Sequence, residues 1–295
     1  MNNFEQPIPL KDHVDQRLLT TDVDLDTSAR NAIVVLDRDH PGFRDENYRA
    51  RRNAIANIAA QYQSGQPLPD APYSNEEHIL WKRIWQGLEI AHERYACAEY
   101  LACVRKLELS KDHIPQLREV SERIKSISGF RLEPIGGLVE PRVFLESLAD
   151  GIFLCTQYIR HSSAPHYTPE PDVVHEISGH AVTLASQRLA ELNREFGNAV
   201  KRSESAEHLD QLSRVYWFTI EFGVLRENDS VKAYGTGLVS SAGELEQMPK
   251  AELREFDPEA MRRQTYDPTK YQPVLFCAES FDAMYQQLGE FLRRW

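Results

Sequence analysis

The sequence predicts a mainly helical protein with a small β element, and three observations support this fold class. Apolar residues repeat at spacings of three and four along several segments, strand-like stretches are few and short, and no low-complexity linker divides the chain. Residues 1–42 are polar and acidic with little periodicity, so we expect a partly ordered lead-in there. Residues 43–295 are expected to form one domain.

Helix signals account for most of this domain. The first helix is expected over residues 44–62, before Gly65 and two nearby prolines. A longer helix should begin at Ser74 and Glu77, which form a capping box in which each side chain satisfies a backbone donor. Its apolar stripe runs from Leu80 to Leu101. Further helices are expected over residues 114–126, 141–153, 171–186, 206–225 and 281–295, and strands over residues 230–234 and 274–277.

Composition and charge exclude several classes of protein. A net charge of −11 without a basic, aromatic-rich run disfavours nucleic acid as a partner. The amino terminus lacks a signal-peptide pattern, and no apolar run is long enough to span a bilayer, so we expect a cytoplasmic protein with no membrane partner. The four cysteines form no CxxC pair and are expected to be reduced thiols, mostly in the core.

The stretch of residues 167–180 concentrates two histidines and three carboxylates at a helix start. His175 and His180 are five residues apart, so on an ideal α-helix their directions would differ by about 140°. Gly179 lies between them and would permit a π-bulge or a tightened turn that brings both rings to one point. The same five-residue step argues against the HExxH signature of zinc peptidases, in which the histidines are four residues apart.

Glu221 is the best candidate for a third ligand, because it interrupts the apolar run of residues 215–225. A buried, ionised carboxylate must be paired or bound to a cation, or else become protonated. An ion pair with Arg214, seven residues earlier, is the alternative. Two histidines and one carboxylate form the facial arrangement of non-haem iron(II) oxygenases.

Several longer motifs extend this pattern: HPGFRD at 40–45, CTQYIRH at 155–161, residues 167–180, YWFTIEFG at 216–223, AYGTGLVSS at 233–241 and AESF at 278–281. Through them the chain resembles the pterin-dependent aromatic amino acid hydroxylases, the family of phenylalanine, tyrosine and tryptophan hydroxylases. The resemblance implies a mainly helical catalytic domain of that type. It also implies that Fe(II), tetrahydrobiopterin or a related reduced pterin, and O2 together hydroxylate the ring of an aromatic amino acid.

Site roles follow from the resemblance, position by position. The implied iron ligands are His175, His180 and Glu221. The implied catalytic residues are Glu176, between iron and pterin, and Tyr216. The implied pterin contacts are the backbone of Gly137, Leu138 and Val139, the ring of Phe144, and Glu176. The implied substrate contacts are Arg160 on the carboxylate, through its planar fork of donors, Thr168 and Ser240 on the amino acid backbone, and Trp217 and Phe222 as pocket walls.

Trp217 resembles the phenylalanine and tyrosine branches, so L-phenylalanine is the expected substrate and tyrosine the expected product. Val182, where the family commonly has proline, and Ala242, where an aromatic is frequent, keep two alternatives open. These are a phenylalanine 3-hydroxylase giving meta-tyrosine for secondary metabolism and a tryptophan hydroxylase. A zinc peptidase or a non-catalytic binding module would be alternatives of another class. The chain offers no room for a regulatory domain before the catalytic unit and no evident coiled-coil tail, so we expect a monomer or weak homodimer.

Overall fold

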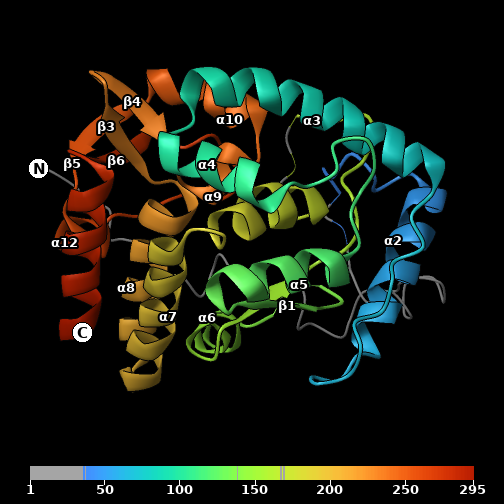
Figure 1. Ribbon diagram of the computed structural model, residues 1–295, viewed down its shortest axis with the longest axis horizontal. Helices are drawn as coiled ribbons and strands as arrows, with labels where there is room; N and C mark the ends of the chain where they lie inside the picture. Colours follow the sequence, from blue (N-terminus) through green and yellow to red (C-terminus); the bar gives the residue numbers. More distant parts are fainter. Residues whose placement is uncertain (1–35, 37, 138, 167, 169) are drawn as a thin grey trace, which may run out of the picture.

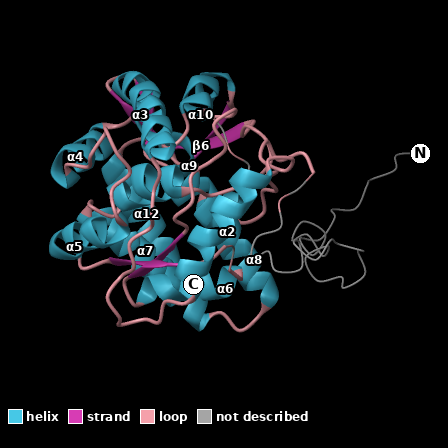
Figure 2. Cartoon of the chain, turned by 90° about the vertical axis from the view of Figure 1, so that its right-hand side faces the viewer, coloured by secondary structure: helices cyan, strands magenta, loops and turns pink. Residues whose placement is uncertain are grey.

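The structure is a computed structural model that describes residues 36, 38–137, 139–166, 168 and 170–295. The predicted lead-in therefore lies outside the described residues, apart from residues 36 and 38–42. Helices dominate the described part, as predicted (Figure 2). The α-helices are α2 (Glu46–Ala60), α3 (Asn75–Tyr95), α4 (Ala98–Leu107), α5 (Leu117–Ser128), α6 (Pro141–Ala149), α7 (Gln187–Arg202), α8 (Ala206–Tyr216), α9 (Thr236–Val239), α10 (Ala242–Gln247), α11 (Pro258–Met261) and α12 (Phe281–Arg294). Two π-helical segments, η3 (His175–Ala181) and η4 (Trp217–Glu221), and the 3-10 turn η5 (Met248–Lys250) complete the set.

The long helix α3 begins where the sequence predicted. Ser74 Oγ accepts a hydrogen bond from Glu77 N, and the Glu77 carboxylate accepts one from Ser74 N at 2.7 Å, so the capping box is confirmed. Figure 1 shows α3 running along one edge of the molecule, from α2 to the neighbourhood of α4 and α10.

The prediction of one continuous helix through Leu101 is wrong, because the chain breaks at Ala96 and Cys97. Cys97 N donates to Ala233 O at 2.9 Å, and Ala96 forms a β-bridge with the same residue. The backbone N–H of Cys97, which a continuing helix would use for its own hydrogen bond, is thus bonded to Ala233 in a distant part of the chain. Cys97 then starts α4 as its N-cap.

Two other predicted helices end earlier than expected. The helix predicted over residues 141–153 stops at Ala149, where Gly151 adopts a φ of 68° and leads into a strand. The helix predicted over residues 206–225 stops at Glu221, and Val224 already belongs to a strand. At Gly223 an added Cβ would overlap Thr219 O and the Tyr234 ring, so only glycine permits this tight turn. Helix α7 lies in a stretch for which no helix was predicted.

Six short strands form two sheets in the described part of the chain. The strands are β1 (Arg131–Pro134), β2 (Ile152–Cys155), β3 (Val224–Glu227), β4 (Ser230–Ala233), β5 (Glu252–Glu255) and β6 (Val274–Ala278). In the larger sheet the order is β4-β3-β6-β5; β3 and β4 form an antiparallel hairpin, and β6 is parallel to β3 and β5. In the second sheet β1 and β2 pair in parallel. The predicted strands at residues 230–234 and 274–277 are confirmed as β4 and β6.

Most buried apolar side chains form one continuous core, in which α7 packs against α6 and α12 (Figure 1). Residues Glu176–Ala181 of η3 are all buried, and α9 packs against both η3 and η4. The core therefore holds the two π-helical segments together. All four cysteines are free and buried, as expected. Across the described residues, no helix is both long enough and apolar enough to cross a bilayer.

Candidate metal centre and active site

The two histidines of the dense segment lie on a π-helix. A π-helix has i→i+5 hydrogen bonds, so residues five apart stack on one side of it. The rings of His175 and His180 accordingly meet, with centroids 4.7 Å apart and Nε2 atoms 3.0 Å apart. The helix distortion predicted beside Gly179 is therefore confirmed as a seven-residue π segment.

Glu221 also ends a π-helical segment, η4, in which Phe222 N donates to Trp217 O at 2.8 Å. Nothing in the apolar run predicted this second distortion. Arg214 forms an ion pair with Asp210 at 2.9 Å. The alternative in which Arg214 pairs with Glu221 is therefore wrong.

His175, His180 and Glu221 converge, each offering one ligand atom within 4.8 Å of the others. Glu221 Oε1 lies 3.1 Å from His180 Nε2, and Glu221 Oε2 lies 3.7 Å from His175 Nε2. Two imidazole nitrogens and one carboxylate oxygen make a donor set suited to a divalent transition metal. The three residues predicted as ligands are therefore brought together from separate parts of the chain.

Two hydroxyl groups border the cluster. Ser240 Oγ lies 3.0 Å from Nδ1 of His175, whereas the other ring nitrogen of His175, Nε2, faces His180. Thr236 Oγ1 donates to Glu221 Oε2 at 2.8 Å. Ser240 was predicted as a substrate contact, whereas here it contacts a ligand ring. Thr236 was missed, because no local signal marks a threonine whose partner is fifteen residues away in the chain.

Burial and charge place His175 and Glu221 in the protonation states that metal binding requires. Burial lowers the pKa of His175 to about 4, so its ring is neutral at pH 7 and has a free lone pair. Burial disfavours the charge of Glu221, but His180, His175 and the Thr236 hydroxyl outweigh it and lower its pKa to about 2. A neutral imidazole and an ionised carboxylate can bind a cation without first releasing a proton.

Glu176 lies on the same π segment and is almost fully buried. Its Oε1 accepts hydrogen bonds from Thr156 N at 3.1 Å and Thr156 Oγ1 at 3.0 Å. Burial nevertheless raises its pKa to about 7. Glu176 is therefore a carboxyl group that can exchange a proton near neutral pH, next in the chain to a candidate ligand.

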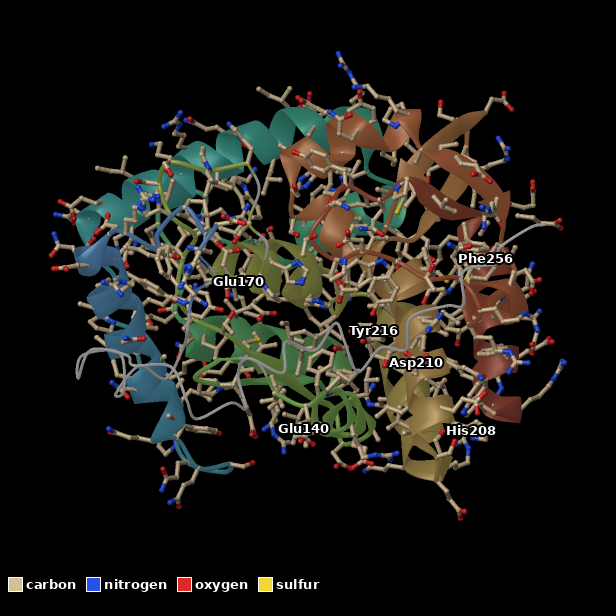
Figure 3. The ribbon with its side chains drawn as sticks, turned by 180° about the vertical axis from the view of Figure 1, so that it is seen from behind. Glu140, Glu170, His208, Asp210, Tyr216 and Phe256 are labelled. Atoms are coloured by element: carbon tan, nitrogen blue, oxygen red, sulfur yellow. The ribbon has the colours of Figure 1, made fainter. Side chains whose placement is uncertain are left out.

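Aromatic rings connect the predicted pterin side to the cluster. Phe144 of α6 meets Phe153 edge-on at 5.4 Å, and Phe153 lies over His180 with centroids 4.3 Å apart. Phe144 also meets Tyr216, whose hydroxyl donates to Asn193 Oδ1 at 3.3 Å. Figure 3 labels Tyr216 near the centre of the molecule, whereas His208 of the same helix lies toward its edge. Tyr216 thus presents its ring to Phe144 and its hydroxyl to α7.

The backbone segment predicted to hold the pterin follows β1. Gly137 and Val139 are half-buried in the connection to α6, whereas Leu138 lies outside the described residues. This connection ends at Glu140, the N-cap of α6, which carries Phe144 one turn later. The backbone segment and the Phe144 ring that are predicted to contact the pterin therefore lie just before and just after the start of α6.

Arg160 is buried and engages Asp172 through two side-chain hydrogen bonds, Nε to Oδ2 at 2.9 Å and Nη2 to Oδ1 at 2.7 Å. Asp172 also accepts from Arg160 N at 2.8 Å and from His175 N at 3.2 Å. One carboxylate thus ties the predicted substrate clamp to the start of the histidine helix. In the sequence Asp172 is one of the three carboxylates at the helix start of residues 167–180, and its contacts with Arg160 and His175 were not predicted.

Trp217 is the first residue of η4 and Phe222 directly follows its last residue; their ring centroids are 4.6 Å apart. Trp217 also stacks on Tyr266 at 4.1 Å and donates from Nε1 to Gln272 Oε1 at 3.0 Å. Neither Tyr266 nor Gln272 was singled out in the sequence. Thr168, the other predicted substrate contact, is half-buried, and its neighbours 167 and 169 lie outside the described residues.

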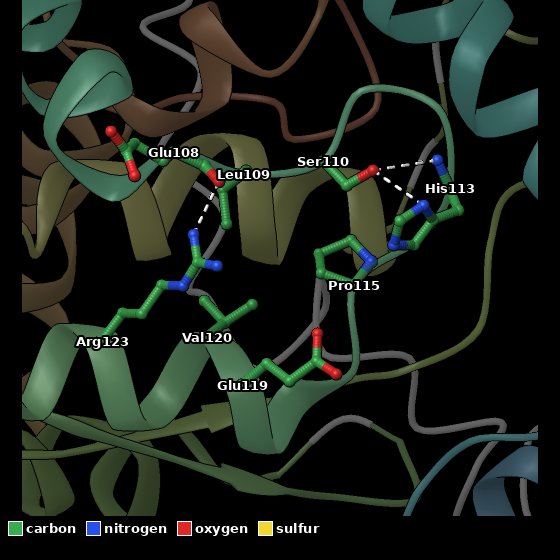
Figure 4. A pocket seen from close by; sticks show the side chains of 8 residues that line it. All are labelled: Glu108, Leu109, Ser110, His113, Pro115, Glu119, Val120 and Arg123. Atoms are coloured by element: carbon green, nitrogen blue, oxygen red, sulfur yellow. Dashed lines mark hydrogen bonds between the residues drawn. The ribbon is translucent and has the colours of Figure 1, made fainter.

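Two hollows of the described part of the chain differ in their relation to this site. One, of about 460 Å³, is bordered by Arg160 together with residues of α2 and the start of α3. The other, of about 210 Å³, lies between the Glu108–Pro115 connection and α5 and is lined by no predicted site residue (Figure 4). In it Ser110 Oγ contacts His113, and Arg123 donates to the backbone carbonyls of Leu107 and Glu108, so these polar groups already have partners.

Comparison with known proteins agrees with this geometry. The model of the biopterin-dependent aromatic amino acid hydroxylase family matches residues 20–295. The chain therefore belongs to this family, which confirms the resemblance seen in its motifs.

Tyrosine 3-monooxygenase of Mus musculus is 44% identical over 265 residues, covering 88% of this chain and 53% of that protein. Phenylalanine-4-hydroxylase of Homo sapiens is 42% identical over 262 residues, covering 87% and 58%. The chain thus spans about half the length of the curated relatives it matches.

Solved structures share the fold. Phenylalanine hydroxylase from Legionella pneumophila superposes with a TM-score of 0.71 at 31% identity, covering 80% of this chain and 95% of that one. Phenylalanine hydroxylase from Chromobacterium violaceum, solved with iron(III) and oxidised 7,8-dihydrobiopterin, superposes with a TM-score of 0.73 at 25% identity, covering 92% of each chain.

Proposed function

We propose that this chain is a non-haem iron(II), tetrahydropterin-dependent monooxygenase that hydroxylates the ring of L-phenylalanine to give tyrosine. The observation that carries the proposal is the convergence of His175, His180 and Glu221 in a chain of the biopterin-dependent family. The family match favours this chemistry over a zinc peptidase or a binding module.

His175, His180 and Glu221 are the proposed iron ligands. The fit rests on their donor set, two imidazoles and one carboxylate, which is the set used by non-haem iron(II) sites that keep positions open for oxygen and substrate. Bound iron and reduced pterin would supply the activation of O2, with the pterin donating two electrons, one oxygen atom entering the ring and the other leaving with the pterin.

The pterin is proposed to lie on Phe144, with the backbone of Gly137, Leu138 and Val139 at its edge. Support comes from the ring contacts that link Phe144 through Phe153 to His180. Glu176 is proposed to hold a proton between metal and pterin, since burial raises its pKa to about 7. Tyr216 is proposed to support Phe144 through its edge-on contact at 6.0 Å.

The amino acid is proposed to bind with its carboxylate on Arg160 and its ring between Trp217 and Phe222. Asp172 uses two donors of the Arg160 guanidinium, and Pro165 O accepts a third from Nη1 at 3.4 Å; the group carries five in all, so two donors remain for a carboxylate. Thr168 and Ser240 are proposed to contact the amino acid backbone. Holding the ring in one orientation is the main contribution that these side chains make to the reaction.

Phenylalanine is preferred over tyrosine because the solved bacterial relatives named above are phenylalanine hydroxylases. It is preferred over tryptophan because Trp217 resembles the phenylalanine and tyrosine branches. The curated relatives include both activities at 42–44% identity, so substrate choice needs a direct test.

The test is reconstitution with Fe(II) under anaerobic conditions, followed by O2, reduced tetrahydrobiopterin and L-phenylalanine. Separation of ortho-, meta- and para-tyrosine should give the para isomer, and parallel reactions with L-tyrosine and L-tryptophan should be slower. A meta-tyrosine product would overturn the proposed para position of hydroxylation. Faster turnover of another amino acid would overturn phenylalanine as the proposed substrate. The absence of pterin-dependent product from all three amino acids would overturn the proposal.

A further inference from the structure

We propose that Thr236 is a positioning residue of the metal centre, whose hydroxyl holds the Glu221 carboxylate and so strengthens metal binding. The inference rests on the proposed function only in taking His175, His180 and Glu221 as ligands of a divalent metal. It concerns the affinity of the site for the metal alone, without pterin or substrate.

Two close approaches between segments fix the position of Thr236. A Cβ added to Gly235 would overlap Glu221 O, so the chain before Thr236 lies directly on the end of η4. A Cβ added to Gly179 would lie 3.0 Å from Thr236 O, so Thr236 itself lies directly on η3. Its side chain is fully buried between the two segments that carry the ligands. The hydroxyl therefore has a defined place beside the cluster.

The hydroxyl of Thr236 has one hydrogen to donate and two acceptor oxygens within hydrogen-bond distance. Glu221 Oε2 lies at 2.8 Å and Ile220 O at 3.1 Å. The carboxylate receives the hydrogen, because it is closer and because hydrogen bonds to an ionised acceptor are stronger. The same hydroxyl oxygen lies 3.4 Å from His180 Nε2, so Thr236 contacts two of the three proposed ligands.

This contact makes the two oxygens of Glu221 unequal. Oε2 accepts the hydrogen bond of Thr236, whereas Oε1 lies 3.1 Å from His180 Nε2 and is the oxygen that we assign to the metal. A buried carboxylate already held in one orientation loses less freedom when it binds a cation. Hydrogen-bond partners of metal ligands typically change metal affinity by about 10-fold to 100-fold.

The test measures binding of cobalt(II) alone to the full chain, by visible absorption in competition with a chelator of known affinity. Thr236→Val, which keeps the shape, and Thr236→Ala, which cannot overpack the site, both remove the hydroxyl. Each should raise the dissociation constant about 10-fold to 100-fold. Thr236→Ser keeps the hydroxyl and should bind within a few-fold of wild type. Rescue by serine separates the hydroxyl from a merely structural effect of the side chain.

Thr219→Val is the matched control. Thr219 is also fully buried and lies on η4, but its hydroxyl donates to Val215 O at 2.6 Å. This variant should bind cobalt(II) as wild type does. Wild-type affinity in both Thr236→Val and Thr236→Ala would overturn the inference, even where the wild-type chain hydroxylates phenylalanine. A wild-type chain that binds no cobalt(II) would overturn it as well. Weakened binding in these two variants, in a chain that produces no hydroxylated amino acid, would uphold it while the proposed function fails.

Discussion

Ser240 Oγ lies 3.0 Å from Nδ1 of His175, on the opposite side of the ring from the nitrogen that faces His180 and Glu221. When Nε2 binds a cation, Nδ1 carries the proton and donates it to this hydroxyl, which fixes both the tautomer and the ring orientation. A residue predicted to contact substrate is therefore also able to support a metal ligand.

Ser240→Ala should weaken metal binding about 10-fold or more, because the His175 ring loses this partner. The measurement is the rise in melting temperature when Fe(II) is added anaerobically, since a ligand that binds only the folded state stabilises it. The rise should be smaller in Ser240→Ala than in wild type. Ser213→Ala is the control, because the Ser213 hydroxyl bonds only Leu209 O within α8. An equal rise in all three proteins would refute the role of Ser240.

Glu221→Gln should lose most of its iron, because the amide keeps the shape of the side chain but removes the negative charge. Metal analysis after anaerobic reconstitution and desalting measures the loss. Glu252→Gln removes the same charge from an exposed side chain and should retain iron as wild type does. Iron content and activity at wild-type levels in Glu221→Gln would contradict the ligand assignment.

Asp172→Ala should lower the free energy of unfolding by about 3–5 kcal/mol, because it leaves the buried Arg160 guanidinium without its anion. Urea titration of the metal-free protein gives this value. Glu290→Ala breaks an exposed ion pair with Arg294 on α12 and should change it by less than about 1 kcal/mol. Similar effects of the two substitutions would show that the buried pair contributes no more than a surface pair.

Gly179→Ala should destabilise the protein by about 1–3 kcal/mol and weaken metal binding, because its Cβ would press on Thr236 O at 3.0 Å. Gly87→Ala offers the opposite case. Gly87 lies inside α3, where an added Cβ meets nothing closer than the His166 ring at 3.6 Å, so alanine should stabilise by about 0.5–1 kcal/mol. Thermal and urea unfolding of both variants test the contrast, which would fail if the two changes had the same sign.

His92 should make the protein less stable at mildly acidic pH. Burial lowers its pKa to about 4, whereas an unfolded chain has a histidine pKa near 6.5. The unfolded state therefore takes up a proton between these values that the folded state does not, and the free energy of unfolding falls as pH is lowered through this range. Between pH 7 and pH 5 the contribution is about 2 kcal/mol.

His92→Gln removes this titration, so the loss of stability between pH 7 and pH 5 should be smaller than in wild type by about that amount. Urea titrations at the two pH values give the comparison. The ring of His92 contacts Val239 O at 2.6 Å and the Tyr100 hydroxyl at 3.4 Å, so glutamine retains a polar group for these partners. Identical pH dependence in the two proteins would contradict the assignment.

Local patterns in the chain were enough to identify the helical fold class, the capping box at Ser74 and the strands β4 and β6. They also identified His175 and His180 as a pair that requires a distorted helix, because the five-residue step is incompatible with a regular α-helical face. Glu221 stood out because a lone carboxylate in an apolar run needs a partner. These signals lie within one turn or one run of residues, where spacing and composition act directly.

Only the tertiary structure decided where several elements end and which groups complete the site. The break at Cys97 depends on Ala233, and the contacts of Ser240, Thr236 and Asp172 depend on segments from distant parts of the chain. A hydroxyl or carboxylate gives no local indication of a partner that packing supplies, because its hydrogen-bonding capacity is the same in a turn, at a helix cap or beside a ligand.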